Sequence, residues 1–319
     1  MSILITGAGG FIGSNLAEYF VNKGEKVIGL DNLSNGSIKY LKKINSNSNF
    51  IFIKADLLKP KTYIENIKNT HNIEPISEVW HLAANSDIPL GISDSKIDLD
   101  DTFLTTYKVL ELMKQLKIKT IFFASSSAIY GNISDRKLTE DIGPLLPISN
   151  YGAMKLASEA IISAAVESYL EKAYIFRFPN VIGIPATHGV IYDFINKLKQ
   201  TPSELHVLGN GTQQKTYLHV DELINSMIYI SSNVNEKINL YNIASNDNGV
   251  TVKFIAEEVI RIVSPNANII YGKENKGWTG DVPKFFYSTK KLTNIGYTSK
   301  INSKESVKLA VKQIYNSLK

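Results

Sequence analysis

A tyrosine and a lysine four residues apart, Tyr151 and Lys155, form the pair in this sequence best suited to acid–base chemistry. Ser149 or Asn150 can cap a helix that begins here, and residues four apart share one face of a helix. The phenol of a free tyrosine has a pKa of about 10, which is too high for a base at neutral pH. A nearby ammonium group and a helix amino terminus both stabilise the phenolate, so we expect them to lower the pKa of Tyr151.

Ser127 is the third residue of this predicted catalytic group. It follows a predicted strand, Thr120–Ala124, and its hydroxyl could share the proton and polarise a substrate oxygen. A Tyr-x-x-x-Lys spacing alone is equally typical of an ordinary exposed helix face. The catalytic interpretation therefore depends on a second motif elsewhere in the chain.

That second motif is the glycine-rich segment near the amino terminus. A short apolar run, Ile3–Thr6, predicts a strand buried on both faces, and a helical pattern follows it. Between them, Gly7 permits a tight turn, Gly10 lets the backbone approach a pyrophosphate, and Gly13 lets the helix pack closely on the sheet. Three glycines alone would also fit an ordinary turn, so the residues that follow decide between the two interpretations.

Asp31 favours the dinucleotide interpretation. It ends a second predicted strand, Lys26–Leu30, at about the distance from the glycines where an acidic residue binds the adenosine ribose hydroxyls. A carboxylate there repels the 2′-phosphate of NADP. The sequence therefore predicts an NAD site, and the oxidised nicotinamide adds a further cation that favours the Tyr151 phenolate.

Strand and helix patterns alternate through the first half of the chain, which predicts an α/β fold with a doubly wound, Rossmann-type parallel sheet. Further strands are expected at Asn49–Lys54, Glu78–Leu82, Thr120–Ala124 and Ala173–Phe178, and helices at Ile97–Lys117 and Tyr151–Leu170. Shorter segments follow at Val190–Lys199, Thr216–Val220, Asp221–Ile230, Ile238–Ile243, Val252–Ser264 and from Ser303. We predict a Rossmann domain over 1–178 with 215–245 returning to it. Residues 179–214 and 246–319 are expected to form a smaller carboxyl-terminal substrate-binding lobe over the carboxyl edge of the sheet.

Composition excludes several classes of function. Lys and Arg exceed Asp and Glu by five but are scattered, so no nucleic-acid interface is expected. The chain has no cysteine, and its five histidines show no metal-ligand spacing, so neither disulfides nor a metal site is predicted. The sequence opens directly into the first predicted strand, so we expect no targeting leader, and no apolar run approaches membrane-spanning length. We expect a cytoplasmic protein without a membrane partner.

Several motifs together resemble the extended short-chain dehydrogenase/reductase family, in particular its NAD-dependent sugar-nucleotide epimerases and dehydratases and most of all the UDP-glucose 4-epimerase group. The resemblance covers essentially the whole chain. It rests on residues 6–13, 31–34, 55–57, 81–84, 125–131, 151–155, 177–180, 217–221 and 280–283.

The resemblance implies a role for each matching residue. NAD would be bound by Gly7, Gly10, Phe11, Ile12, Asp31, Asn32, Ser34, Asn35, Gly36, Asp56, Leu57, Leu82, Ala83, Ala84, Tyr151, Lys155 and Pro179. The nucleotide-sugar substrate would be bound by Ser86, Asp87, Ser127, Asn180, Gly189, Val190, Ile191, Lys215 and Trp278. Asp56 has an alternative, because an Asp at the end of a strand also caps the next turn. A homodimer that pairs the helices Ile97–Lys117 and Tyr151–Leu170 is the family's usual assembly, although their apolar residues could equally be intramolecular core.

The residues after Ser127 favour one reaction within the family. Dehydratases of the family carry Asp-Glu there, and decarboxylases carry a Glu at the second position, whereas this chain has Ala128 and Ile129. The cysteine acid of the 3,5-epimerases is also absent. The resemblance therefore implies epimerisation at C4 of a nucleotide sugar such as UDP-glucose, UDP-galactose or their N-acetyl forms, through a 4-keto intermediate.

Departures from the family pattern leave the nucleotide and the sugar open. Lys215 stands where the family has a phosphate-binding arginine, and Trp278 lies where a second arginine is expected. Ser86 and Asp87 also differ from the commonest epimerases. Two alternatives follow: another enzyme of the same family, such as a dehydratase or a reductase, and a non-catalytic NAD-binding protein.

Overall fold

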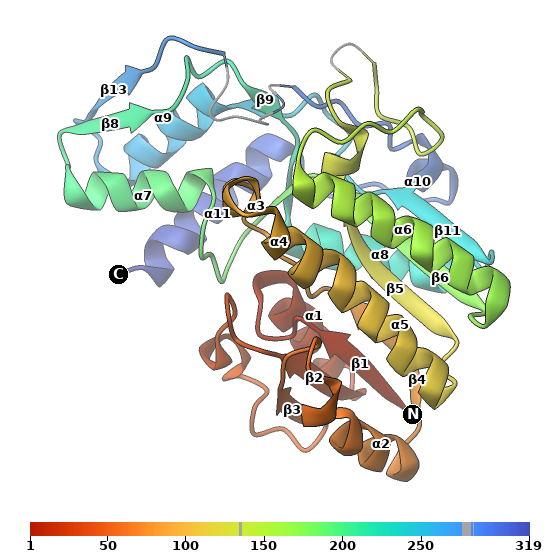
Figure 1. Ribbon diagram of the computed structural model, residues 1–319. Coiled ribbons are helices and arrows are strands. Elements are labelled where there is room, and N and C mark those ends of the chain that lie inside the picture. The colour runs from red at the N-terminus through yellow and green to blue at the C-terminus, as the bar shows by residue number, and fades with distance from the viewer. Residues whose placement is uncertain (134–135, 276–281, 283) are drawn as a thin grey trace. The chain divides into compact units, whose positions relative to one another are not determined.

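A computed structural model describes residues 1–133, 136–275, 282 and 284–319. Its central element is a seven-stranded sheet in the order β11-β6-β5-β4-β1-β2-β3 (Figure 1). The strands are β1 Ser2–Thr6, β2 Lys26–Asp31, β3 Phe50–Lys54, β4 Ile76–His81, β5 Thr120–Ser126, β6 Lys172–Phe178 and β11 Ile238–Asn242. The pairs β1–β2, β2–β3, β1–β4 and β4–β5 are parallel. The predicted Rossmann-type α/β fold is confirmed.

The strand order places a topological switch beside β1. From β1 the chain adds β2 and β3 on one side and then returns to add β4, β5 and β6 on the other. In such sheets the crevice outside the carboxyl ends of the strands at the switch point is where ligands bind. The ends of β1, β2 and β4 are therefore the first place to look for a site.

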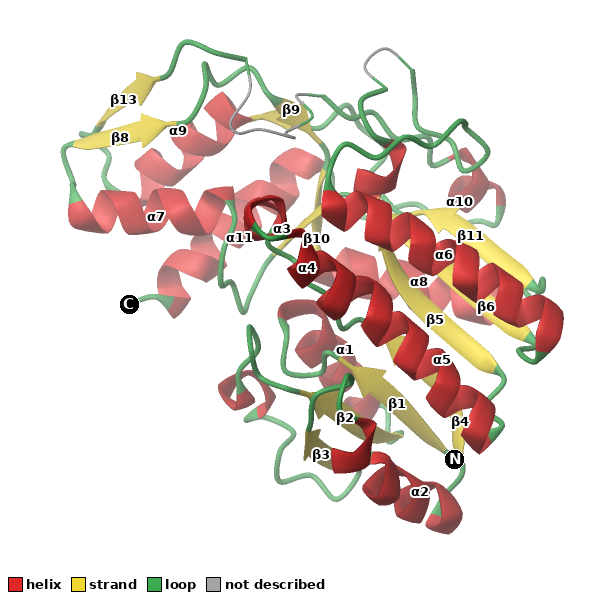
Figure 2. Cartoon of the chain, in the orientation of Figure 1, coloured by secondary structure: helices red, strands yellow, loops and turns green. Residues whose placement is uncertain are grey.

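Six helices belong to the described residues of the sheet-bearing unit: α1 Phe11–Asn22, α2 Ile64–Ile73, α3 Ile88–Ser93, α4 Ser95–Asp98, α5 Thr105–Leu116 and α6 Asn150–Ser168 (Figure 2). The predicted helix Ile97–Lys117 is corrected, because a π-helical stretch, Leu99–Leu104, separates α4 from α5. The short helices α2 and α3 were not predicted. Most other predicted boundaries differ from the observed ones by one or two residues.

Alternate residues of the central strands bury on opposite faces of the sheet. On one face Val79, Ile121 and Phe123 belong to a core that also contains residues of α2, α5 and α6. On the other face Trp80 stacks on Phe122, with ring centroids 4.0 Å apart. Burial on both faces explains why the strands are continuous apolar runs instead of alternating patterns.

The chain divides into two compact units. The first comprises Met1–Ile129, Leu146–Arg177 and Ser231–Tyr241, and the second comprises Tyr130–Leu145, Phe178–Ile230 and Asn242–Lys319. Beyond Phe178 the elements are β7 Asn180–Ile182, α7 Val190–Gln200, β8 Glu204–Val207, β9 Gln214–Lys215, β10 Tyr217–His219, α8 Val220–Asn233, β12 Val250–Thr251, α9 Val252–Val263, β13 Asn268–Tyr271, α10 Lys290–Asn294 and α11 Ser303–Ser317. Apolar faces of α7, α9 and α11 form the core of the second unit. Its assignment to substrate binding stays a prediction.

Candidate functional site

The turn between β1 and α1 has the geometry that a dinucleotide requires. Gly7 has φ +72°, and a Cβ there would lie 2.8 Å from the backbone nitrogen of Ala83 at the end of β4. A Cβ on Gly13 would lie 2.0 Å from the Gly7 carbonyl oxygen. Both positions therefore exclude a side chain, which brings α1 and β4 close to the turn.

The amino terminus of α1 is free to bind an anion. Gly10 occupies the N-cap position, and no side chain caps the first turn of the helix. The backbone N–H groups of Phe11 and Ile12 begin the helix, where the helix dipole favours negative charge. These residues fit the pyrophosphate of NAD.

Asp31 lies beside this turn, as the sequence predicted for the residue that binds the adenosine ribose. Its Oδ2 accepts a hydrogen bond from the Gly9 backbone nitrogen at 2.8 Å, and its Oδ1 accepts one from Leu33 at 2.6 Å. Burial raises the pKa of Asp31, and the two backbone hydrogen bonds oppose that shift. Each carboxylate oxygen retains a lone pair for a hydroxyl group.

The loop after β2 and the end of β3 contribute backbone turns. The Asn32 side chain accepts from the Ser34 backbone nitrogen at 2.9 Å, and a Cβ on Gly36 would lie 2.6 Å from the Gly9 oxygen. Asp56 accepts from the Leu58 nitrogen at 2.9 Å, so it does cap its own turn. Whether Asp56 also binds adenine stays a prediction.

The predicted catalytic pair lies at the start of α6 (Figure 1). The Ser149 side chain caps this helix by accepting from Gly152, and a Cβ on Gly152 would lie 2.4 Å from the Ala128 oxygen. The helix therefore begins in close contact with the residues that follow β5. One turn further, Lys155 is buried, and its Nζ lies 5.8 Å from the centre of the Tyr151 ring.

The ionisation of this pair differs from the prediction. Burial raises the pKa of Tyr151 to about 12, although we expected a lowered value. Burial also lowers the pKa of Lys155 to about 7, while nearby Glu159 favours its charged form. In the chain without NAD, desolvation outweighs the stabilisation of the phenolate by Lys155 and by the helix amino terminus.

The structure gives Tyr151 a different serine partner from the predicted one. Ser126, the last residue of β5, is the serine whose hydroxyl lowers the pKa of Tyr151, against the effect of burial. Ser127 follows in a short 3₁₀ turn and is 9% exposed. The catalytic role that we predicted for Ser127 therefore lacks this contact.

A buried polar network behind Lys155 was not predicted. Glu159 lies one helical turn beyond Lys155 and forms a bidentate ion pair with Arg177 of β6, at 3.0 Å from Nε and 2.6 Å from the terminal nitrogen. Ser125 donates to the same carboxylate, and Lys155 donates to the neighbouring Ala124 oxygen at 2.6 Å. The i+4 spacing from Lys155 to Glu159 was the available sequence signal.

His81, the last residue of β4, is close enough to Lys155 for the charge of the lysine to affect its ionisation. Its Nδ1 lies 2.7 Å from Thr6 Oγ1 and its Nε2 lies 3.0 Å from Thr106 Oγ1. Thr106 gives its own hydrogen to the Thr102 oxygen, so Nε2 is the protonated nitrogen and Nδ1 accepts from Thr6. Burial, reinforced by the charge of Lys155, lowers the pKa of His81 to about 3.

Nine further predicted residues fall into three groups. Ser86 and Asp87 follow β4 in the first unit, where Asp87 caps α3. Pro179, Asn180, Gly189, Val190, Ile191 and Lys215 belong to the second unit, with Gly189 capping α7 at φ +99° and Lys215 in β9. Trp278 lies outside the described residues. Contact of these residues with substrate stays a prediction.

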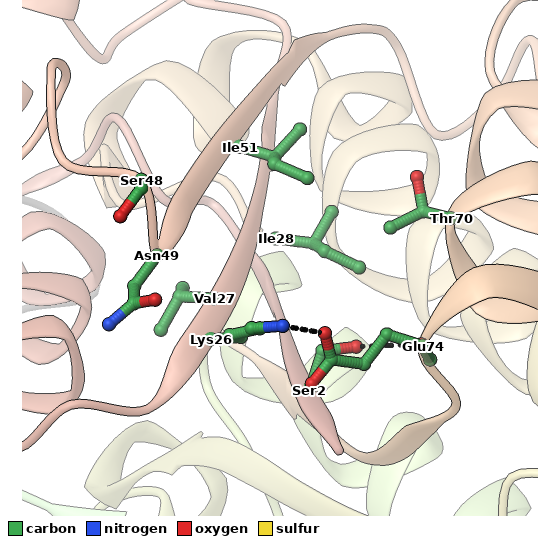
Figure 3. A pocket seen from close by; sticks show the side chains of 9 residues that line it. All are labelled: Ser2, Lys26, Val27, Ile28, Ser48, Asn49, Ile51, Thr70 and Glu74. Carbon is green, nitrogen blue, oxygen red and sulfur yellow. Dashed lines mark hydrogen bonds and ion pairs between the residues drawn. The ribbon is translucent and has the colours of Figure 1, made fainter.

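A surface pocket of the first unit lies at the amino-terminal side of the sheet, away from the carboxyl ends of the strands (Figure 3). It is lined by Ser2, Lys26, Val27, Ile28, Ser48, Asn49, Ile51, Thr70 and Glu74. Most of these residues lie at the amino-terminal ends of β1 to β3, whereas Thr70 and Glu74 come from α2 and its carboxyl end. Lys26 forms an ion pair with Glu74. Because ligands of this fold bind at the carboxyl ends, this pocket is not the candidate site.

Within the described ranges, no group of His, Asp and Glu side chains could bind a metal ion. In that same part of the chain, no helix is both long enough and apolar enough to span a membrane.

A Rossmann sheet with a glycine-rich first turn and a Tyr–Lys pair on one helix indicates a nicotinamide-dependent enzyme. The model of the NAD dependent epimerase/dehydratase family matches residues 3–244, and the chain belongs to this family. The cofactor of the protein is accordingly NAD, and membership of this family makes it an enzyme of nucleotide-sugar metabolism.

Particular relatives include both epimerases and a dehydratase. The chain is 27% identical to a UDP-glucuronate 4-epimerase of Thermodesulfobacterium geofontis, over 84% of this chain and 82% of that one. It is 30% identical to a dTDP-D-glucose 4,6-dehydratase of Dictyostelium discoideum, over 82% of this chain and 62% of the relative. The crystal structure of a UDP-galactose 4-epimerase superposes with a TM-score of 0.86 at 28% identity, covering both chains completely.

Proposed function

We propose that this protein is a nucleotide-sugar 4-epimerase that acts on UDP-glucose and UDP-galactose or on their N-acetyl forms. The observation that carries the proposal is the acid–base set at the end of β5 and the start of α6. This set contains Tyr151, Lys155 and a serine. The three residues that follow Ser126 are Ser127, Ala128 and Ile129, and none of them carries a carboxyl group. One acid–base group suffices for epimerisation, whereas dehydration needs further proton donors and acceptors.

Each residue of the set has a defined task. Tyr151 takes the proton of the C4 hydroxyl and returns it to the C4 oxygen after the 4-keto sugar has turned over and hydride has been delivered to its other face. Bound NAD supplies the reversible hydride transfer at C4. Lys155 stabilises the Tyr151 phenolate by its charge, and Ser126 is placed by its contact with Tyr151 to bind the same substrate oxygen. We propose Ser126 for this role in place of Ser127.

The family resemblance implies which residues would bind the substrate. Ser86 and Asp87 would contact the sugar, whereas Asn180, Gly189, Val190, Ile191, Lys215 and Trp278 would bind the nucleotide. Lys215 gives one point charge where an arginine would give a bidentate contact, which favours weaker, less directional binding of the diphosphate. These assignments and a homodimer through α5 and α6 follow the family resemblance, and light scattering tests the dimer.

Product analysis tests the reaction. Purified protein is incubated with UDP-glucose, UDP-galactose, their N-acetyl forms and UDP-glucuronate, and the products are analysed by mass spectrometry and proton NMR. Epimerisation leaves the mass unchanged and inverts the coupling at C4. A product lighter by one water would replace the proposal with dehydration, as in the Dictyostelium relative.

Tyr151→Phe provides the matched control for catalysis. The variant removes the proton acceptor and keeps the ring, so we expect turnover to fall at least about a thousandfold while NAD binding persists. Calorimetry measures the binding and NMR the turnover. Undiminished turnover would exclude Tyr151 as the base, and absence of turnover in both proteins with NAD binding intact would favour a non-catalytic NAD-binding protein.

A further inference from the structure

The side chain of Asp98 occupies an unusual environment in the first unit. It ends α4, directly before the π-helical stretch Leu99–Leu104, and is 0% exposed. Its Oδ1 accepts from the Asn85 side chain at 2.8 Å, whereas its Oδ2 is buried without a hydrogen-bond partner. π-Helical segments within helices frequently occur at functional sites. A buried carboxyl group with one neutral partner therefore calls for an explanation.

The fold makes room for this carboxyl group next to the catalytic helix. A Cβ on Gly91 would lie 1.8 Å from Asp98 Oδ2, so only glycine fits there. The Gly91 carbonyl in turn accepts from the Asn150 side chain at 2.9 Å. Asn150 directly precedes Tyr151, so this chain of contacts connects Asp98 to the start of α6.

The charges around Asp98 and Tyr151 are unbalanced. The groups that face the two side chains are Asn85 and Asp87 from the segment before α3, Asp101 from the next turn, Lys155 from α6 and Ser126 from β5. Within the described part of the chain, Asp98 forms no salt bridge. Lys155, a nearby cation, donates its hydrogen bond to the Ala124 oxygen. Burial raises the pKa of Asp98, and Asp98 in turn raises the pKa of Tyr151.

We propose that Asp98 is a positioning residue that sets the pH at which Tyr151 becomes a base. This inference rests on the proposed function, in which Tyr151 takes a proton and returns it. Such a group works best when neither protonation state is strongly favoured. The Lys155 charge favours the phenolate, and the Asp98 carboxylate favours the phenol. With NAD bound, the nicotinamide cation adds to the charge of Lys155, and the Asp98 carboxylate opposes these two positive charges.

Asp98→Asn tests the proposal because it removes the charge and preserves the shape. We expect the acidic limb of the pH profile of kcat/KM to move to lower pH by about one unit, a tenfold change in the phenolate fraction at a given pH. In the NAD-bound protein, the ultraviolet difference spectrum against the matching Tyr151→Phe protein isolates the Tyr151 phenolate. Its midpoint should move by the same amount. Asp100→Asn removes a partly exposed carboxylate of the neighbouring π-helical stretch, which pairs with Lys96, and should move neither.

An unmoved acidic limb would overturn the proposal. So would a limb that moves while the phenolate midpoint stays, because Asp98 would then act without Tyr151. If Asp98→Asn does not fold, Asp98→Ser removes the same charge and is assayed identically. The spectroscopic midpoint needs no substrate, so it tests Asp98 even if the protein fails to epimerise any nucleotide sugar, which would count against the proposed function alone.

Discussion

Glu159→Gln is the variant that tests most directly how this site keeps Lys155 charged. Residues four apart on a helix lie about 6 Å from one another. Two unit charges at that distance interact by about 3 kcal/mol at an effective dielectric constant of about 20, which corresponds to about two pKa units. Because Arg177 binds the same carboxylate, we halve this effect to about one unit. The pKa of Lys155, about 7 in the intact chain, would then fall by about one unit.

The consequence appears on the alkaline side of the pH profile. A lower pKa means that Lys155 loses its charge at lower pH, so the alkaline limb of kcat/KM should move down by about one unit. Turnover near pH 8 should fall about tenfold, with a smaller loss near pH 6. Initial rates of epimerisation across this range, followed by NMR, measure the effect.

Arg177→Met separates the effect on the charge of Lys155 from the effect on the stability of the fold. Glu159→Gln and Arg177→Met each break the same buried ion pair, which costs about 3–5 kcal/mol, so both variants should unfold at lower urea concentrations. Their effects on Lys155 are opposite, however, because Arg177→Met leaves the full charge of Glu159 facing the ammonium group. The alkaline limb should therefore move up in Arg177→Met. If the alkaline limb moves in the same direction in the two variants, or moves in neither variant, this account of Lys155 is refuted.

Two further predictions concern His81 and Asp31. The pKa of His81 is about 3 in the folded chain and 6.5 in the unfolded chain, so the unfolded state binds more protons below pH 6.5. The free energy of unfolding therefore decreases as the pH is lowered, by up to about 5 kcal/mol near pH 3. His81→Gln should remove that part of the pH slope in urea unfolding measured from pH 7 to 4, and an unchanged slope would contradict it. Asp31→Ser removes a carboxylate that repels a 2′-phosphate, so calorimetry should show NAD binding weakened at least about tenfold and the preference over NADP reduced. An unaltered preference would mean that Asp31 does not contact the ribose.

Local sequence signals predicted the parts of the site that depend on neighbouring residues. The β1–α1 turn and Asp31 follow from glycine spacing and strand ends, and the structure shows the same turn with Asp31 bonded to Gly9. The Tyr151–Lys155 face follows from helical periodicity. The short helix α3 and the π-helical stretch were missed because tertiary packing, not periodicity, determines them. Gly91 lies in α3 and Asp98 directly precedes the π-helical stretch, and no sequence spacing predicts that the two residues are close together.

The serine assignment shows a limit of a different kind. Three consecutive serines, 125 to 127, are chemically identical, and the sequence does not indicate which of their side chains contacts Tyr151. The point at which β5 ends decides this: Ser125 bonds to Glu159, Ser126 contacts Tyr151, and Ser127 has entered the next turn. A shift of one residue along a strand changes the face that a side chain occupies. Motif matching alone therefore leaves such an assignment uncertain by one residue.

In the chain without NAD, the pKa of Tyr151 moves in the direction opposite to the prediction, which included the nicotinamide cation, for a related reason. The sequence identifies the charged groups near a residue in the chain, but burial is a property of the fold, and here desolvation is the largest effect on both Tyr151 and Lys155. Two buried carboxyl groups outside the Tyr-x-x-x-Lys motif then adjust the pair in opposite ways. Glu159 keeps the lysine charged, and Asp98 opposes the phenolate. It follows that two enzymes can share the motif and still work in different pH ranges, and that residues 98 and 159 are where such a difference should be sought.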